Sequence, residues 1–423
     1  MSSGSALTQP AGQPVVDIVG LADDFVKEGI DLRKGRLETE SDPFWKGLCA
    51  LGSKLWLDTG DIDAATALWT DEFAALTTNN TLLNAEVQKG IYDDLIQKAA
   101  GALSGLERQT QIIEIAFILN ARHGLRLVQR FGGRVSVELH TDLAHDVERS
   151  VAYGHRYYNI CPEHFIIKVP LTASGLIAMR RLREEGIPVN FTLGFSARHN
   201  YIATRFGAPS YVNVFLGRLN AYMVDNQLGN GKLVGEKAAL ASQRAVKSTS
   251  EGNQKPTQQI AASLRDAEQL RYLAGIDVFT MPTKVATDAR EKLSGQWESS
   301  VANDYAINLN NDISETDLRV NTLWEVSDAE RQLADGLTTD VPQTAKALVD
   351  RAHDAGAGDL FPRLSDTDLA RIAADGKVPK HAVWADRVKS GELAIDTLLN
   401  LAGLASFASD QKALDDRIRR LIA

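Results

Sequence analysis

Lys168 is the residue whose surroundings in the sequence most need a chemical explanation. It lies in HFIIKVP, residues 164–170, a run of apolar and β-branched residues that is typical of a buried strand in a parallel sheet. Burial disfavours the charged form of an amine, so a lysine in such a strand gains access to its neutral, nucleophilic form. A neutral amine attacks carbonyl carbons and forms a Schiff base, which is an electron sink for C–C bond cleavage. A structural ion pair is the alternative, and the strand by itself favours the ion pair.

Two carboxylates are available as partners for Lys168. Asp58 lies in KLWLDT, residues 54–59, and Glu138 lies in RVSVEL, residues 134–139. Schiff-base chemistry needs groups that take up and return protons, which carboxylates can do. Either acid could equally neutralise a buried lysine without any catalysis.

Polar residues share faces of other candidate strands. Residues two apart in a strand lie on one face, so Lys168 is expected on the face of Ile166, opposite to Phe165, Ile167 and Val169. The same alternation groups Glu138 with Ser136 and Arg134, Asn190 with Thr192, Asp58 with Trp56, Thr77 with Asn79, and Asn213 with Phe215. Barrel interiors are normally filled with Val, Ile and Leu, so polar groups on six strands together predict a polar pocket.

Two arginines, Arg218 and Arg265, follow directly after candidate strands. A guanidinium group can hold a phosphate through paired hydrogen bonds, and Ser263 and Asn213 could add further ones. The alternative for each arginine is a surface salt bridge, for example with Asp266, and composition alone favours the salt bridge.

Short strands that alternate with helical segments predict an α/β fold, a (β/α)8 TIM barrel. The strands are expected at 54–59, 73–79, 134–139, 164–169, 188–195, 210–216, 258–263 and 277–282. Helices are expected at 142–157, 172–186, 264–274 and 283–295, with two more within 83–129. A doubly wound open sheet is the competing architecture, but its Gly-rich first turn is missing, and GNGK at 229–232 is expected to be a turn.

The chain divides into four expected segments. They are a flexible tail at 1–15, a helical segment at 16–53 packed outside the barrel with Trp45 in apolar contact, the barrel at 54–300, and a helical extension at 301–423 packed on the barrel. The final stretch, residues 408–423, has the apolar spacing of an amphipathic helix.

The composition and charge of the chain argue against several classes of protein. The net charge is −9 without a basic run, so nucleic acid is not an expected partner. Cys49 and Cys161 are far apart, which excludes a thiol zinc site and suits a reducing compartment. No apolar run approaches the roughly 20 residues of a membrane span, and no signal pattern is found. We expect a cytoplasmic protein that does not bind membranes, with homo-oligomer formation left open.

Taken together, the ordered stretches resemble transaldolases, which are Schiff-base enzymes of the pentose phosphate pathway. The stretches are LDTGDI, TTNNTLL, VSVEL, IIKVP, VNFTLGFS, VFLGR and ASLR, and they span about residues 54–295. FASDQKALDDRI, further along the chain, is similar to the family's C-terminal helix. The resemblance reverses the preference for structural roles of Lys168 and of both arginines.

The resemblance implies a role for each matching residue. Lys168 matches the Schiff-base lysine, and Asp58 matches the acid that moves the proton at the C4 hydroxyl of the sugar. Glu138 and Thr192 match the pair that positions a catalytic water. The matching substrate-binding positions are Asn79 and Asn190 for the dihydroxyacetone hydroxyls, and Arg218, Arg265 and Ser263 for the phosphate, with Asn213 and Phe215 in the same pocket. Neither a metal nor an organic cofactor is implied, because the imine supplies the electron sink.

Several positions depart from the family pattern. Asn80 stands where proline is common, which predicts a less rigid loop, and Asn213 stands where a phosphate-binding serine is common. His140 and His145 are not expected from the family, and their spacing suits capping or solvated roles better than a metal site. Residues 330–400 are additional, and they could cover the barrel, form an oligomer contact or cap the site.

The resemblance implies transfer of a dihydroxyacetone unit from a ketose phosphate to an aldose phosphate. The expected donors are sedoheptulose 7-phosphate and fructose 6-phosphate, and the expected acceptors are glyceraldehyde 3-phosphate and erythrose 4-phosphate. One alternative is a fructose-6-phosphate-type aldolase that releases free dihydroxyacetone. That branch carries tyrosine where this chain has Phe215, which favours transfer. The other alternative is a sugar-phosphate-binding barrel without catalysis, and the retained lysine and carboxylates argue against it.

Overall fold

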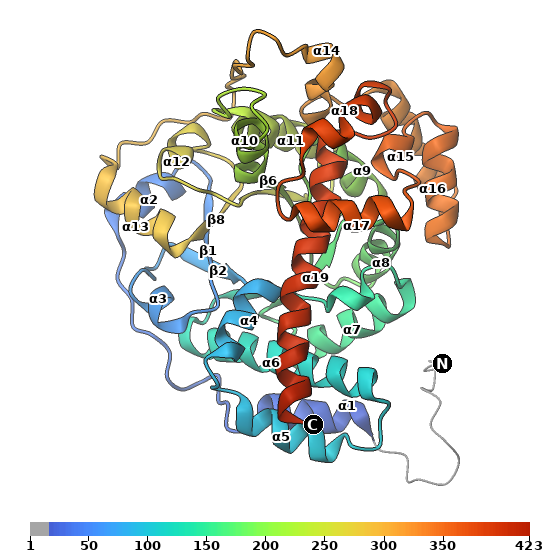
Figure 1. Ribbon diagram of the computed structural model, residues 1–423. Helices are drawn as coiled ribbons and strands as arrows, with labels where there is room; N and C mark the ends of the chain where they lie inside the picture. The colour runs from blue at the N-terminus through green and yellow to red at the C-terminus, as the bar shows by residue number, and fades with distance from the viewer. Residues whose placement is uncertain (1–16) are drawn as a thin grey trace.

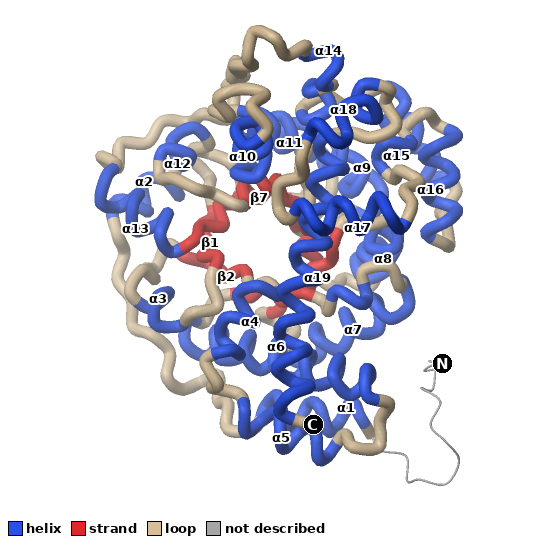
Figure 2. Tube along the Cα trace, viewed as in Figure 1, coloured by secondary structure: helices blue, strands red, loops and turns tan. Residues whose placement is uncertain are grey.

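The computed structural model describes residues 17–423, so the tail expected at 1–15 lies outside the described residues. Eight parallel strands close into a barrel in chain order, and helices surround them (Figure 1; Figure 2). The strands are β1 (Lys54–Asp58), β2 (Phe73–Thr77), β3 (Arg134–Glu138), β4 (Phe165–Pro170), β5 (Val189–Thr192), β6 (Tyr211–Phe215), β7 (Gln258–Ala262) and β8 (Val278–Pro282). Each predicted strand is present, and the (β/α)8 barrel predicted from the sequence is confirmed.

Helices join successive strands on the outside of the barrel. They are α3 (Ile62–Thr66) after β1; α4 (Asn80–Gln88), α5 (Asp93–Ala102) and α6 (Arg108–Phe131) after β2; α7 (Val147–Ile160) after β3; α8 (Ala173–Glu184) after β4; α9 (Ala197–Gly207) after β5; α10 (Leu216–Asp225) and α11 (Val234–Ser250) after β6; α12 (Glu268–Tyr272) after β7; and α13 (Thr283–Lys292) after β8. Within residues 17–423, no helix combines the length and the apolar character needed to cross a bilayer.

Within the barrel, three helix predictions were wrong in number or extent. Segment 83–129 was expected to hold two helices, but α4, α5 and α6 occupy this region, because a turn with Gly90 at φ +81° ends α4 early. The helix expected at 142–157 begins at Val147, since the Asp146 carboxylate caps the first turn there, and a separate turn of 3-10 helix, η1 (Thr141–Leu143), precedes it. The helix expected at 264–274 is reduced to α12.

The lower part of the barrel interior is filled by aromatic side chains. Trp56 of β1 and Tyr211 of β6 meet edge to face inside the barrel, with ring centroids 4.7 Å apart. Because residues two apart share a face, Asp58 and Asn213 lie one layer above this pair, towards the C-terminal ends of the strands. The aromatic layer therefore forms a packed floor beneath the polar side chains.

Extra helices precede and follow the barrel. The first are α1 (Ile18–Lys27), which packs on α6, and α2 (Pro43–Cys49), whose Trp45 ring lies 5.5 Å from the Phe73 ring at the start of β2. Those after the barrel are α14 (Glu315–Leu318), η2 (Val320–Leu323), α15 (Asp328–Thr339), α16 (Ala345–Asp354), η3 (Gly358–Leu360), α17 (Asp366–Asp375), α18 (His381–Lys389) and α19 (Ile395–Leu421).

The long helix α19 runs along one side of the mouth of the barrel, with α17 in contact with it (Figure 1). Asn400 donates hydrogen bonds from Nδ2 to the carbonyl oxygens of Leu171 at 3.1 Å and Leu193 at 2.9 Å, just after β4 and β5. The helix expected at 408–423 in fact begins at residue 395. Its first half is buried on several sides, so it lacks the one-sided apolar spacing that identified the second half.

A buried cluster of charges joins the barrel to the C-terminal extension. Arg198 of α9 is 1% exposed and contacts three carboxylates: Asp396 at 2.7 Å, Glu330 at 2.9 Å and Asp359 at 3.0 Å. Burial alone would raise the pKa of Asp396, but the charges of Arg198 and then His199 lower it well below the usual range. The carboxylates come from α15, η3 and α19, so one guanidinium group holds three parts of the extension together.

We expect Arg198→Met to lower the free energy of unfolding by about 3–5 kcal/mol, because it leaves buried carboxylates without their counter-charge. Chemical denaturation monitored by circular dichroism measures the change. The matched control is Arg205→Met on the same helix, where Arg205 pairs with Asp335 of α15 at 2.8 Å but is 44% exposed in its side chain. The control should lose less than about 1 kcal/mol. Equal losses in the two variants would contradict the prediction.

Candidate active site

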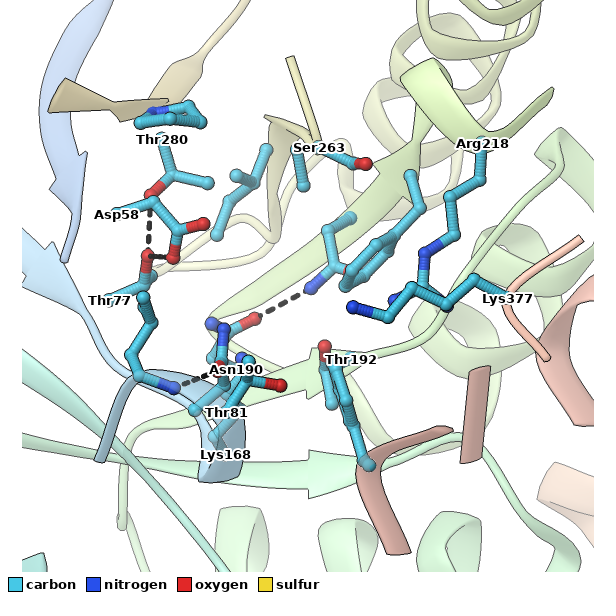
Figure 3. A pocket seen from close by; sticks show the side chains of 18 of the residues that line it. Asp58, Thr77, Thr81, Lys168, Asn190, Thr192, Arg218, Ser263, Thr280 and Lys377 are labelled. Atoms are coloured by element: carbon cyan, nitrogen blue, oxygen red, sulfur yellow. Dashed lines mark hydrogen bonds between the residues drawn. The ribbon is translucent and has the colours of Figure 1, made fainter. Parts of the chain in front are cut away.

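The strand register brings three polar side chains to one level of the barrel. Glu138 of β3 is opposite Lys168 of β4, and Lys168 is opposite Asn190 of β5. In parallel strands, residues in register point to the same side of the sheet, and here that side is the barrel interior. The polar pocket predicted from strand alternation is therefore present at the C-terminal ends of the strands (Figure 3).

The amine of Lys168 lies in a buried, partly polar environment. Its Nζ donates to the carbonyl oxygen of Thr78 at 3.1 Å and lies 3.8 Å from Oε2 of Glu138. The side chains of Lys168 and Glu138 are only 5% and 4% exposed. The ring of Phe407, from α19, has its centroid 5.7 Å from the same nitrogen. The amine is thus held near one carboxylate and covered by the C-terminal helix.

Asp58 lies at the end of β1, two strands away from Glu138 on β3. Its Oδ1 accepts a hydrogen bond from Thr77 Oγ1 at 2.6 Å, and Thr77 is in turn 2.6 Å from Oγ1 of Thr280 (Figure 3). Burial raises the pKa of the Asp58 carboxyl above its usual value, although the charge of Lys168 and the Thr77 hydrogen bond oppose the rise. An acid with a raised pKa is suited to exchange a proton near neutral pH.

Glu138 is the one predicted catalytic residue that does not line the main pocket; it lies next to it, beside Lys168. Burial raises the pKa of Glu138, while the Lys168 charge and a hydrogen bond from the backbone of Asn80 lower it in part. The N–H of Asn80 donates to Oε2 of Glu138 at 3.2 Å. Asn80 is the first residue of α4, so the residue that departs from the family's common proline supplies a donor that proline lacks.

Two side-chain amides form a hydrogen-bonded chain inside the pocket, above the aromatic layer. Asn213 donates from Nδ2 to Oδ1 of Asn190 at 3.0 Å, and Asn190 donates from Nδ2 to Ser136 Oγ at 3.1 Å. The amide of Asn213 is thereby directed to Asn190.

Two further predicted site residues differ in their hydrogen bonding. The Thr192 hydroxyl is buried and has no hydrogen-bond partner within residues 17–423. The side-chain oxygen of Asn79 accepts a hydrogen bond from Leu82 N at 2.9 Å and so caps α4.

Two arginines form one end of the pocket. Arg218 of α10 is 5% exposed, and burial followed by repulsion from Arg265 lowers its pKa to about 10, with Asp410 and Glu138 acting in the opposite sense. Its Nε and Nη1 atoms have no hydrogen-bond partner among the described residues. Among residues 17–423, neither arginine finds a carboxylate for the surface salt bridge that was the alternative from sequence; Asp266 instead accepts from the backbone N of Gln269 at 3.2 Å.

The close approach of the two arginines depends on Gly217. A Cβ atom at this position would lie 2.1 Å from the carbonyl oxygen of Ser263 and 2.8 Å from Cγ of Arg265. Ser263 itself adopts a left-handed backbone conformation, with φ at 62°. The glycine in VFLGR therefore lets the start of α10 pack against the loop after β7.

Apart from Glu138, every predicted site residue lines this one pocket. The lining residues are Asp58, Thr77, Asn79, Thr81, Leu82, Lys168, Asn190, Thr192, Asn213, Phe215, Arg218, Ile260, Ala262, Ser263, Arg265, Thr280, Pro282, Lys377 and Phe407. Sequence reasoning omitted Thr280, Thr81, Lys377 and Phe407 from the site. Strand alternation could have identified Thr280, and Phe407 is the first residue of FASDQKALDDRI, the stretch that resembles the family's C-terminal helix, whereas Lys377 has no local signal in the sequence.

The two histidines that depart from the family pattern have separate environments. His140 accepts a hydrogen bond at Nδ1 from Asp142 N at 3.1 Å, which makes it the cap of η1, and its Nε2 lies 3.3 Å from Asp415 of α19. His145 is exposed. A capping role is confirmed for His140. Within residues 17–423, no group of three or more His, Cys, Asp or Glu side chains is arranged to hold a metal ion.

The barrel and its pocket agree with comparisons to known proteins. A family model described as Transaldolase/Fructose-6-phosphate aldolase matches residues 55–339. The chain belongs to this family. It is 28% identical to a transaldolase of Xanthomonas campestris pv. campestris (strain B100) over 314 residues, which cover 70% of this chain and 93% of that relative. It is 34% identical to a probable transaldolase of Thermus thermophilus over 198 residues, which cover 44% of this chain and 81% of that relative.

Family membership supports an enzyme of the transaldolase or aldolase type. The matched region spans all eight strands and ends with α15, so α16 to α19 lie beyond it. The pocket nevertheless includes Lys377 and Phe407 from this later part of the chain.

The contact between Asn80 and Glu138 predicts a change in pH dependence. In Asn80→Pro, the N–H is lost, so the pKa of Glu138 should rise further and the acidic limb of the kcat/KM profile should move to higher pH. Proline suits the first position of a helix, and Asn79 before it is already extended at φ −155° and ψ 173°. The control Asn80→Ala keeps the N–H and should retain the wild-type limb. Coincident profiles for all three proteins would refute the assigned role of this N–H.

Proposed function

We propose that this protein is a transaldolase of the pentose phosphate pathway, acting through a Schiff base on Lys168. It transfers a dihydroxyacetone unit from sedoheptulose 7-phosphate or fructose 6-phosphate to glyceraldehyde 3-phosphate or erythrose 4-phosphate. The observation that carries the proposal is the buried Lys168 amine, which lies 3.8 Å from Glu138 and lines the same pocket as Asp58.

The first step joins the donor sugar to the protein. The Lys168 amine adds to the C2 carbonyl carbon of the ketose, and the resulting carbinolamine loses water to give a protonated imine. Glu138 and Thr192 act on this water: the carboxylate accepts and returns the proton, and the hydroxyl orients the oxygen. The Thr192 hydroxyl is suited to the task because no protein group within residues 17–423 occupies it.

The second step breaks the bond between C3 and C4. Asp58 takes the proton of the C4 hydroxyl, the released aldose leaves as an aldehyde, and the electron pair moves into the imine to form an enamine. The enamine then adds to the acceptor aldehyde, while Asp58 returns the proton to the new hydroxyl. Hydrolysis of the imine frees the product ketose and the Lys168 amine. The imine serves as the electron sink in both directions, so the mechanism requires no metal or organic cofactor.

The remaining side chains orient the sugar. Asn79 and Asn190 bind hydroxyls of the dihydroxyacetone unit, with Asn213 supporting Asn190 at 3.0 Å. Arg218, Arg265 and Ser263 bind the phosphate. The unpartnered Nε and Nη1 atoms of Arg218 support this assignment, because a buried guanidinium group needs acceptors and an anionic ligand provides them.

The second candidate is an aldolase that releases free dihydroxyacetone, and Phe215 argues against it. Release requires a proton to reach the enamine carbon from the protein or from solvent. The Phe215 ring is 9% exposed, lies 5.6 Å from the Phe195 ring and 6.5 Å from the Phe407 ring, and has no group that can donate a proton. An apolar wall of this kind preserves the enamine until an acceptor aldehyde arrives.

The Schiff base can be tested directly. Treatment with borohydride in the presence of fructose 6-phosphate should reduce the imine and leave a dihydroxyacetone adduct on the peptide that contains Lys168, as measured by peptide mass mapping. Lys168→Ala should show no adduct on this peptide. A non-catalytic sugar-phosphate-binding barrel would bind the sugar without any adduct, and an adduct on a different lysine would contradict the assigned nucleophile.

Substitution of Phe215 tests whether the enzyme transfers the dihydroxyacetone unit or releases it as free dihydroxyacetone. In Phe215→Tyr, a phenol enters the pocket and can deliver a proton to the enamine, so free dihydroxyacetone should form from fructose 6-phosphate at a rate increased at least about tenfold. Phe215→Leu, which adds no donor, is the control and should not gain this activity. Product analysis with and without an acceptor aldose makes the distinction. Rapid release of dihydroxyacetone by the unmodified protein would instead favour the aldolase.

A further inference from the structure

One cation of the pocket comes from outside the barrel. Lys377 follows the C-terminal end of α17, in ADGKVP, and lines the same pocket as Arg218 and Arg265. Figure 3 shows its side chain extending into the pocket from the same side as Arg218. Lys377 lies beyond residue 339, where the match to the family model ends, so neither that match nor the strand pattern accounts for it.

The backbone near Lys377 is attached to α10, the helix that begins beside the arginines. Asn226, at the C-terminal end of α10, donates from Nδ2 to the carbonyl oxygen of Pro379 at 3.0 Å. The backbone N of His381 donates to Oδ1 of Asn226 at 2.8 Å, and the His381 ring lies 2.8 Å from the hydroxyl of Tyr222. These contacts begin two residues after Lys377, so they fix the loop that carries it.

The charged side chains that line this end of the pocket are all cationic, although the carboxylate of Asp410, which does not line it, acts on Arg218. Lys377, Arg218 and Arg265 all line it, and none of them forms an ion pair with a carboxylate of the described residues. Arg218 is almost fully buried, and its Nε and Nη1 atoms lack partners in the described part of the chain. Gathering like charges costs free energy unless an anion binds among them.

We propose that Lys377 is a third phosphate-binding cation, which the C-terminal extension adds to the subsite of Arg218 and Arg265. This inference rests on the proposed function, because that function brings a phosphorylated sugar into the pocket. A phosphate monoester has three terminal oxygens, so it can accept hydrogen bonds from two guanidinium groups and one ammonium group together. Residues after α15 therefore help to select phosphorylated sugars over neutral ones.

Kinetics with paired substrates tests the selection. In Lys377→Met, the ratio of kcat/KM for fructose 6-phosphate to kcat/KM for fructose should fall about tenfold, the loss expected for one charge-assisted contact. Lys377→Arg should recover most of the ratio. The control is Lys380→Met on the same loop, because Lys380 is exposed like Lys377 but does not line the pocket; its ratio should stay within about twofold of wild type. An equal loss on both sugars in Lys377→Met would overturn the inference.

Binding of inorganic phosphate gives a readout that needs no turnover. Calorimetry should show a Kd for phosphate about tenfold higher in Lys377→Met than in wild type or Lys380→Met, with a weaker dependence on salt. If the borohydride adduct at Lys168 does not form, the proposed function fails, but phosphate binding still decides the role of Lys377. Equal phosphate Kd values for wild type, Lys377→Met and Lys380→Met would show that Lys377 does not contact the anion.

Discussion

The pocket depends on the burial of one amine beside carboxylates inside a closed barrel. Lys168 can occupy this position because Glu138 lies opposite it on the neighbouring strand and the Thr78 carbonyl accepts its hydrogen bond. Burial raises the pKa values of Asp58 and Glu138, and the charge of Lys168 opposes both shifts. The proton affinities of the acids and the charge of the amine are therefore linked, so a change in strand register or in burial would alter the whole set together.

Strand alternation identified most of the pocket from sequence because a parallel barrel imposes a simple geometry. Side chains two apart share a face, and the C-terminal ends of the strands meet at one rim, so polar residues such as Asn190 and Asp58 could be brought together without knowledge of the loops. The helices were less predictable. The start of α7 depends on a cap at Asp146, and the division of 80–131 into separate helices depends on a turn at Gly90. Both are local features, and each gives a weaker signal in the sequence than the regular spacing of apolar residues.

The contributions of the extension could not be predicted for a different reason. Phe407 lies near Lys168, and Lys377 lines the same pocket as Arg218, although these residues are far apart in the chain. Phe407 begins the stretch that resembles the family's C-terminal helix, but this likeness does not show which barrel side chain the ring faces. Lys377 is an exposed residue of a loop and belongs to no pattern. Their positions follow from tertiary contacts such as those of Arg198 and Asn400, which only the folded chain reveals.

The path of α19 has a consequence for synthesis on the ribosome. Gly403 allows this helix to pass close above the barrel, since a Cβ there would lie 2.9 Å from Leu193 and 3.0 Å from Arg218. The strands are translated well before this helix, so a nascent barrel exposes the Lys168 amine and the apolar surface that α19 later covers. Between completion of β8 and docking of α19, the surface that this helix covers in the finished protein is therefore open to solvent.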